Sequence, residues 1–278
     1  MLKLFHSKIG FIQGRLSPIV NGQIQAFPWN FWMDEFSIAK DNDFKIIEWT
    51  LDQHQLYKNP IMTYEGRKLI KNLSNKYGIS ILSLTGDCFM QSPFFKVGKT
   101  LFKNLIQDLK NIIISCADLG LKFIVFPLVD NGRLENKKQE NLLKEGLALV
   151  DDLLLKNKIK IIFESDFSPN KLKSFIYDFS PNNYGINYDI GNSAAFGYSY
   201  RDEFSAYGER ILNVHIKDRL LDGGTVPLGQ GNADIPAVIR SLNSSGYSGN
   251  YILQTAREKG NDIGILCQSR DKILKWIS

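Results

Sequence analysis

The chain has few cysteines, and they are far apart. Cys88, Cys116 and Cys267 show no C-x₂-C spacing, so neither a zinc finger nor a disulfide framework is predicted. Scattered cysteines of this kind are typical of proteins in a reducing compartment. No stretch approaches the roughly 18 apolar residues of a membrane span, and residues 1–15 are too polar for a signal peptide. We therefore expect a cytoplasmic protein that has no membrane partner.

Long runs of like charge are also missing. The 34 basic and 29 acidic residues are interspersed and give a net charge of +5. Because nucleic-acid-binding segments concentrate their basic residues on one stripe or arm, this pattern does not predict a nucleic-acid partner. The mild basic excess is typical of an ordinary solvated surface.

The 278 residues instead show short β-rich runs that alternate with helical segments from end to end. This alternation predicts an α/β fold in which a parallel sheet is covered by helices. Eight βα units without a break in composition fit a single (β/α)₈ TIM barrel, which typically has about 250 residues. The expected strands are 8–15, 44–52, 79–87, 121–130, 158–166, 183–191, 210–218 and 249–257, and the expected helices are 30–43, 62–77, 98–119, 136–156, 169–178, 201–208, 235–245 and 263–277.

Two of the expected helices carry clear end signals. Apolar residues three and four apart run along 98–119, and Gly120 follows where a left-handed cap would end the helix. In the seventh unit Asp234 can cap a helix that has Pro236 in its first turn, and Gly246 closes it.

Four residues at the ends of consecutive strands could hold one metal ion. They are Glu164, Asp189, His215 and Gln254. The carboxyl ends of barrel strands meet at one mouth, where such barrels build their active sites. Two carboxylates, an imidazole and an amide oxygen suit manganese, cobalt, magnesium or zinc. The alternative is structural: Asp189 would cap a turn into Gly191, and His215 would be a hydrogen-bonded core residue.

Lys217 shares a strand face with His215 because side chains alternate with a period of two. It is therefore expected beside the metal site, one pleat nearer the mouth. Two roles fit it equally: a catalytic proton donor or carrier, or a binder of an anionic substrate.

Further polar residues at the strand ends are predicted to bind substrate. They are Arg15, Glu48, Asp87, Asp130, Asp166, Arg219 and Arg257. Basic members come from the first, seventh and eighth strands and acidic ones from the second to the fifth. This polarity suits a polyol with an anionic end. The Gly-rich segment 220–234 could enclose that anion through its backbone N–H groups, or it could simply be a mobile connection.

Several motifs together resemble the sugar phosphate isomerase/epimerase family of xylose-isomerase-like TIM barrels. The resemblance covers residues 1–278 as one domain. The motifs are IQGRLSP (12–18), QAFPWNFW (25–32), FESDFSP (163–169), NYDIGNSAAFGY (187–198), NVHIKDR (213–219), TVPLGQGNAD (225–234) and YILQTAR (251–257).

The resemblance implies a metal site with two departures. The family's ligands on strands five to eight are glutamate, aspartate, histidine and glutamate. These carry over onto Glu164, Asp189 and His215, whereas Gln254 stands where the second glutamate would be. An amide cannot act as a base, so Lys217 becomes the nearest candidate for the opposite face of the substrate. Asn192, a further predicted substrate-binding residue, stands where some relatives carry a histidine.

The function implied is a metal-dependent isomerase or epimerase of a small ketose or sugar phosphate. Glu164 would remove a proton next to the carbonyl, an enediolate would form, and Lys217 would return a proton. Two alternatives stay open: a metal-dependent dehydratase or lyase on a keto-polyol, and a non-catalytic sugar-binding barrel. A homo-oligomer is not excluded. The family's endonuclease-like branch uses three zinc ions and many histidines, but only His6, His54 and His215 occur here, so a DNA-repair role is rejected.

Overall fold

Eight parallel strands close into a barrel in the computed structural model, which describes residues 5–258 and 260–277. The strands are β1 (Ile9–Ile12), β2 (Ile47–Thr50), β3 (Ser83–Thr85), β4 (Phe123–Leu128), β5 (Lys160–Ser165), β6 (Tyr184–Asp189), β7 (Ile211–Ile216) and β10 (Tyr251–Leu253). Pairing of Ile9 with Tyr251 joins the first strand to the last. Each strand lies inside one of the eight predicted ranges, so the predicted (β/α)₈ barrel is confirmed.

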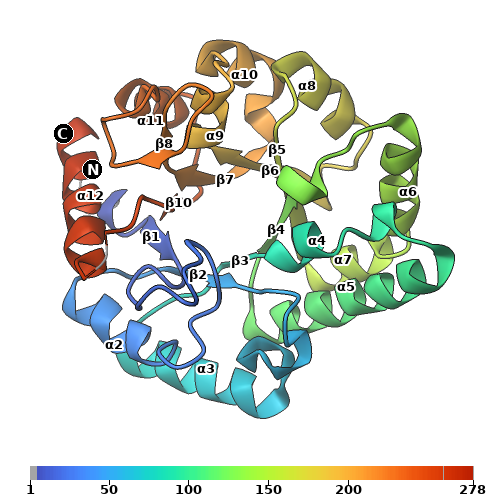
Figure 1. The fold of residues 1–278 in the computed structure, drawn as a ribbon, viewed down its shortest axis with the longest axis horizontal. Helices are drawn as coiled ribbons and strands as arrows, with labels where there is room; N and C mark the ends of the chain where they lie inside the picture. Colours follow the sequence, from blue (N-terminus) through green and yellow to red (C-terminus); the bar gives the residue numbers. More distant parts are fainter. Residues whose placement is uncertain (1–4, 259, 278) are drawn as a thin grey trace.

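Helices surround this barrel as an outer ring (Figure 1). The longer ones are α2 (Asp34–Asp41), α3 (Tyr64–Tyr77), α5 (Lys99–Leu119), α6 (Lys137–Ala148), α7 (Asp151–Asn157), α8 (Pro169–Tyr177), α10 (Tyr200–Tyr207), α11 (Ile235–Ser244) and α12 (Asp262–Ile277). Single 3₁₀ turns occur at Leu56–Lys58, Pro60–Met62, Phe94–Lys96, Asp130–Gly132 and Gly208–Arg210. None of the described helices is long and apolar enough to cross a membrane.

One predicted helix was wrong in its extent. Residues 136–156 form two helices, α6 and α7, because Val150 leaves the helical region at φ −121° and ψ −1°. Val150 is fully buried whereas Leu149 is exposed. The break therefore turns the chain so that Val150 packs into the core, and Asp151 and Asp152 begin a new helix with acidic residues in its first turn.

The predicted end signals are confirmed. Gly120 follows α5 with φ +79°, a left-handed conformation that glycine adopts without steric penalty. The Asp234 carboxylate accepts a hydrogen bond from the Ala237 N–H at 3.2 Å and caps α11, and Gly246 follows that helix with φ +82°.

Three short elements at the barrel mouth were not predicted. They are α4 (Asp87–Gln91), α9 (Ile190–Ala195) and the antiparallel pair of β8 (Asp218–Arg219) with β9 (Thr225–Val226). All are too short for a periodic apolar pattern. The loop after β1 and the β8–β9 segment lie in front of the barrel in Figure 1, so these elements position residues at the mouth.

Aromatic side chains fill the space between the barrel and its helices. The Phe126 ring stacks on Phe89 at 4.6 Å between centroids, and the Phe27 ring lies 5.4 Å from Trp49. Both Phe27 and Trp49 are fully buried. These rings therefore contribute to the packing of the barrel.

Glu35 anchors the loop that follows β1. Its carboxylate accepts hydrogen bonds from the Gly14 N–H at 2.9 Å and the Leu16 N–H at 3.0 Å, and the side chain is fully buried. Burial raises the pKa of Glu35 to about 7, although the two N–H groups favour the charged form.

A raised pKa makes the fold less stable as pH increases. Between its ordinary value of 4.5 and about 7, Glu35 stays protonated in the folded chain after the unfolded chain has lost the proton. We expect the free energy of unfolding to decrease across this window by about 1.4 kcal/mol per pKa unit of the shift. Urea denaturation of the wild type and Glu35→Gln at pH 5 and pH 7.5 measures the effect. Equal pH dependence in the two proteins would contradict it.

Candidate metal centre

Three of the predicted ligands meet at the carboxyl ends of neighbouring strands. Glu164 lies on β5, Asp189 ends β6, and His215 lies on β7 paired in register with Asp189. One potential ligand atom from each lies within 4.8 Å of the other two, and all three residues are buried. Parallel strands in register bring these side chains together, as predicted from their positions at the strand ends.

His215 is oriented by Glu48 from inside the barrel. Its Nε2–H donates to Glu48 Oε1 at 2.7 Å, because a carboxylate can only accept, and this leaves Nδ1 facing Glu164 Oε2 at 3.2 Å. Burial opposes a charge on the ring, yet the adjacent carboxylates of Glu48 and Glu164 raise the pKa of His215 to about 10. A carboxylate behind a histidine is the usual partner of a metal-binding imidazole.

Both oxygens of the Glu48 carboxylate accept hydrogen bonds. It accepts hydrogen bonds from Ser83 Oγ at 2.5 Å, Thr85 Oγ1 at 2.6 Å and Asn213 Nδ2 at 3.0 Å in addition to His215. Burial disfavours its charge, but His215 and the hydrogen bonds from Ser83 and Thr85 together outweigh burial, and the pKa of Glu48 is lowered. The carboxylate is therefore held ionised and fixed in the centre of the barrel.

Each oxygen of Glu164 accepts one amide N–H. Asn192 Nδ2 donates to Oε1 at 2.8 Å, and Asn187 Nδ2 donates to Oε2 at 3.0 Å. Burial would raise the pKa of Glu164, but His215, the Lys217 ammonium and the Asn187 amide lower it to about 2. Glu164 is thus ionised near neutral pH.

Asn192 connects Glu164 to the cavity. While its Nδ2 donates to Glu164, its Oδ1 accepts from Arg219 Nη1 at 2.8 Å. Arg219 is held in turn by the Gly223 carbonyl at 2.7 Å and 3.0 Å. The Asp189 carboxylate caps α9 by accepting the Asn192 N–H at 2.8 Å. This hydrogen bond fixes the start of α9 and therefore the position of Asn192.

Two buried atoms in the cluster face charged groups of the protein rather than hydrogen-bond partners of good geometry. Asp189 Oδ2 lies 2.7 Å from the Lys217 ammonium, and His215 Nδ1 lies 3.2 Å from Glu164 Oε2. Buried carboxylate oxygens are stable only where a cation or a donor satisfies them. Two carboxylates and one imidazole nitrogen form a donor set that fits a divalent cation such as Mn²⁺, Co²⁺, Mg²⁺ or Zn²⁺. Glu164, Asp189 and His215 therefore form a candidate metal site.

The fourth predicted ligand, Gln254, contacts Lys217. The Lys217 Nζ donates to Gln254 Oε1 at 3.1 Å and lies 2.7 Å from Asp189 Oδ2, so the ammonium sits between the amide and the carboxylate cluster. Gly191 permits this position, because a Cβ there would come 3.0 Å from the Lys217 backbone carbon. Burial raises the pKa of Asp189 despite the nearby ammonium.

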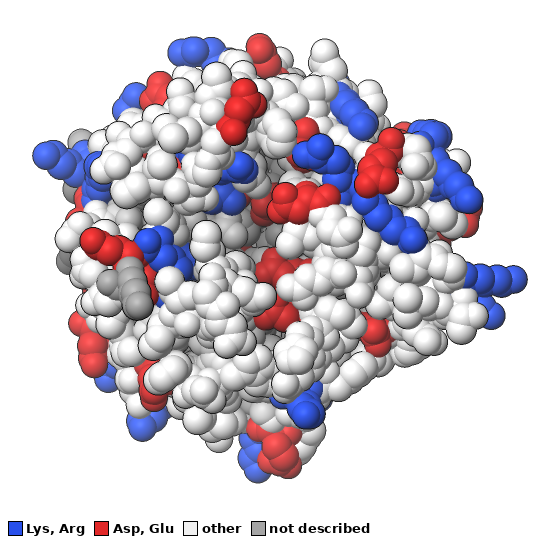
Figure 2. All heavy atoms as spheres, in the orientation of Figure 1, with Lys and Arg blue, Asp and Glu red and all other residues white. Residues whose placement is uncertain are grey.

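A cavity of about 440 Å³ opens above this cluster at the barrel mouth. Figure 2 shows the hollow with acidic side chains gathered in it. Its lining includes eight of the predicted site residues: Asp87, Asp130, Glu164, Asp166, Asn192, Lys217, Arg219 and Gln254. Gln25, Thr85 and Arg133 also line it and were not predicted. Gln25 and Arg133 lie in loops that carry no strand-end signal, and Thr85 ends β3 without a charged side chain.

Three residues predicted to bind substrate lie outside this lining. Glu48 is beneath His215 with no exposed surface. Arg15 is buried and donates to the Thr255 carbonyl at 3.2 Å and to Gln25. Arg257 is paired with Asp262 at 3.0 Å. The polar group of each of these three residues thus bonds to another part of the protein. Their positions at the strand ends could not predict these contacts.

The Gly-rich segment does not present its N–H groups to the cavity. Those of Gly229, Gly231 and Ala233 donate to the Asp218 carboxylate at 2.7, 3.0 and 3.2 Å. The suggestion that this segment encloses an anion through these groups is therefore wrong. Their donors are already used to fold the segment back onto β8.

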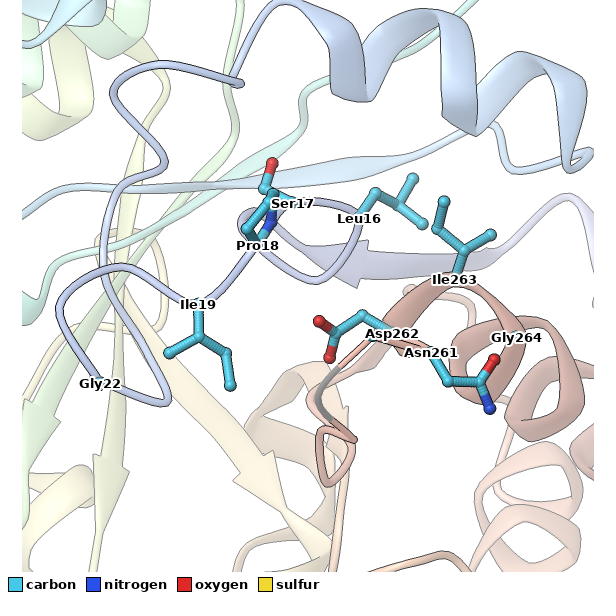
Figure 3. Close-up of a pocket in the computed structure, with 10 residues that line it drawn as sticks. Leu16, Ser17, Pro18, Ile19, Gly22, Asn261, Asp262, Ile263 and Gly264 are labelled. Carbon is cyan, nitrogen blue, oxygen red and sulfur yellow. The ribbon is translucent and has the colours of Figure 1, made fainter.

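A larger hollow of about 650 Å³ lies away from the metal centre, between residues 16–22 and 260–264 (Figure 3). Leu16, Pro18, Ile19 and Ile263 make it largely aliphatic, and Asp262 at its edge is occupied by Arg257. Its described lining residues include no cluster of ligating side chains. The smaller cavity above Glu164 is therefore the candidate site.

Comparison with known proteins agrees with this geometry. The model of the xylose isomerase-like TIM barrel family matches residues 36–275. The chain belongs to this family. L-ribulose-5-phosphate 3-epimerase UlaE of Escherichia coli O1:K1 is 21% identical over 239 residues, covering 83% of this chain and 84% of the enzyme.

Solved structures show the same fold. The IolI protein with a bound zinc atom superposes with a TM-score of 0.73 at 17% identity and covers 98% of this chain and 99% of that one. An L-ribulose 3-epimerase superposes with a TM-score of 0.72 at 15% identity and covers 98% and 94%. The chain thus belongs to this family, and it has a buried cluster of Glu164, Asp189 and His215 at the barrel mouth.

The cluster predicts one divalent cation per chain. Elemental analysis after loading with Mn²⁺, Co²⁺, Zn²⁺ or Mg²⁺ is expected to give about one ion, lost in a Glu164→Ala, His215→Ala double mutant because two of three charged or basic ligands are gone. Asp166→Asn is the control, since Asp166 lines the cavity but pairs with Arg133. Retention of metal by the double mutant, or its absence from the wild type after all four loadings, would contradict the site.

Glu48 is predicted to strengthen metal binding without touching the ion. Glu48→Gln replaces the charged acceptor of the His215 Nε2–H by a neutral amide. The tautomer and orientation of His215 are then less firmly fixed. We expect metal affinity to fall about 10- to 100-fold, measured by competition with a chelating dye. A matched circular dichroism spectrum controls for folding, and unchanged affinity would show that the buried contact has only a structural role.

Proposed function

We propose that the protein is a divalent-metal-dependent isomerase or epimerase of a small ketose that acts through an enediolate. The observation that carries this proposal is the placement of Glu164 and Lys217 at the same cavity as the candidate metal cluster. One residue is an ionised carboxylate and the other a lysine next to an amide. The relatives named L-ribulose-5-phosphate 3-epimerase and L-ribulose 3-epimerase give this reaction class further support.

Glu164 would take the proton from the carbon next to the substrate carbonyl. The electron pair of that C–H bond moves onto the carbonyl oxygen, which gives the enediolate. With a pKa of about 2, Glu164 is a weak proton acceptor, so the carbon acid must be activated strongly. A bound divalent cation would supply that activation as a Lewis acid on the substrate oxygens, a contribution of several kcal/mol.

Lys217 would return a proton to the opposite face of the enediolate. Gln254 Oε1 accepts one of its hydrogens at 3.1 Å, and both residues line the cavity that Glu164 also lines. In this role the lysine–amide pair replaces the second carboxylate of the family pattern. Solvent then restores the proton to Lys217 and removes it from Glu164, so the cycle consumes no other reactant.

Hydrogen exchange at the substrate carbon tests the separate roles of Glu164 and Lys217. With metal-loaded enzyme in D₂O, Glu164→Gln is expected to lose deuterium incorporation by at least about 100-fold, because general-base catalysis contributes about 10²–10⁴. Lys217→Met is expected to keep exchange into the starting sugar while losing product, because Glu164 still works on one face. NMR of a ketose and ketose-phosphate panel measures both.

The same experiment separates the competing functions. Release of water with a deoxy keto product would indicate a dehydratase. Binding of a sugar with no exchange in the wild type would indicate a non-catalytic barrel. Loss of exchange in both variants alike would contradict the roles proposed for the two residues.

A further inference from the structure

Asn192 stands between two charged side chains at the cavity wall. Its Nδ2 donates to Glu164 Oε1 at 2.8 Å, and its Oδ1 accepts from Arg219 Nη1 at 2.8 Å. The orientation of this amide is unambiguous, because a carboxylate can only accept hydrogen bonds and a guanidinium can only donate them. The two charged groups thus bond to opposite ends of one amide, and within the described residues they form no ion pair with each other.

The surrounding backbone fixes where this amide lies. Asn192 is buried in the first turn of α9, where its own N–H donates to Asp189 Oδ1 at 2.8 Å. Arg219 belongs to β8, and its Nε and Nη2 donate to the Gly223 carbonyl at 3.0 Å and 2.7 Å. These contacts leave Nη1 as the guanidinium nitrogen that faces the amide and, beyond it, Glu164.

A direct contact between Arg219 and Glu164 would be strong. Both residues line the same cavity. Arginine forms short, charge-assisted hydrogen bonds with carboxylates, often through two N–H groups at once, and its guanidinium stays protonated in proteins. Such a pair would therefore compete with a divalent cation for Glu164. It would also hold the carboxylate that is proposed to take the proton from the substrate.

We propose that Asn192 is a positioning residue that separates the Arg219 guanidinium from Glu164. The neutral amide gives each charged group a hydrogen bond of the right polarity and keeps Glu164 available for a metal ion. Asn192 was predicted to bind substrate, whereas in this role it acts through Glu164. The inference rests on the metal site of the proposed function, and it adds the residue that keeps a cation of the protein out of that site.

Metal affinity in a double-mutant cycle tests the separation. Binding of Mn²⁺ is measured by competition with a chelating dye for the wild type, Asn192→Ala, Arg219→Met and the double variant. Asn192→Ala is expected to weaken binding at least about tenfold, because the released guanidinium can pair with Glu164. The gain in affinity from Arg219→Met is expected to be at least about tenfold larger in the Asn192→Ala background than in the wild type, since only there does the guanidinium reach the ligand.

Asn187 supplies a matched control. Its Nδ2 also donates to Glu164, to Oε2 at 3.0 Å, but its Oδ1 accepts from the neutral amide of Asn213 at 2.9 Å. Asn187→Ala therefore removes one amide donor from Glu164 without releasing a cation. In this background the gain from Arg219→Met is expected to equal the gain in the wild type within about threefold. The comparison distinguishes separation of two charges from the loss of a hydrogen bond on a metal ligand.

Asn192→Leu serves as the test if Asn192→Ala does not fold. Leucine fills a similar volume and makes neither hydrogen bond, so the gain from Arg219→Met is expected to be as large in its background as in that of Asn192→Ala. Circular dichroism of the metal-free proteins checks that each variant is folded. General loss of structure at the site would not be reversed by Arg219→Met, whereas the proposed competition for Glu164 would.

The inference is overturned if Arg219→Met gives the same gain in the wild-type and Asn192→Ala backgrounds, or an equally large gain in Asn187→Ala. It is also overturned if the wild type binds no Mn²⁺. Metal binding requires no turnover, so the expected gain in a protein that exchanges no substrate hydrogen would sink the proposed function and leave this inference standing. Exchange in the wild type without that gain would do the reverse.

Discussion

The buried contact between Glu48 and His215 is the interaction on which the site depends. Both residues have no exposed surface, and their 2.7 Å contact joins β2 to β7 across the barrel interior. A charge pair at such depth is tolerated only when its remaining hydrogen bonds are made, and breaking one partner costs roughly 3–5 kcal/mol. Ser83, Thr85 and Asn213 provide those bonds. The other polar side chains of the cluster are arranged around this fixed imidazole.

A series of contacts between polar side chains leads from His215 outward to the cavity wall. Its Nδ1 faces Glu164, whose two oxygens are held by Asn187 and Asn192, and Asn192 accepts from Arg219 at the cavity wall. Each polar group is thus positioned by the one beneath it. A site of this kind is rigid before ligand arrives, which favours catalysis because little reorganisation remains to be done at the reaction step.

The cavity is also asymmetric in charge. On one side Lys217 lies against Gln254 and Asp189, so a cation occupies that side. On the other side lie the acidic side chains of Asp87 and Asp130. The barrel fold alone permits many chemistries. The positions of these few side chains, rather than the fold, are what narrow the reaction and the substrate.

The sequence by itself determined the eight strands, most helices and the convergence of Glu164, Asp189 and His215, since alternation and strand ends are local properties that parallel pairing turns into neighbours. Only the tertiary structure decided which strand-end residues face the cavity. Arg15, Glu48 and Arg257 carry the same local signal as Asp87, yet their partners Thr255, His215 and Ser17 are supplied by distant parts of the chain. Hydrogen-bond partners at long range are set by packing, which no local pattern records.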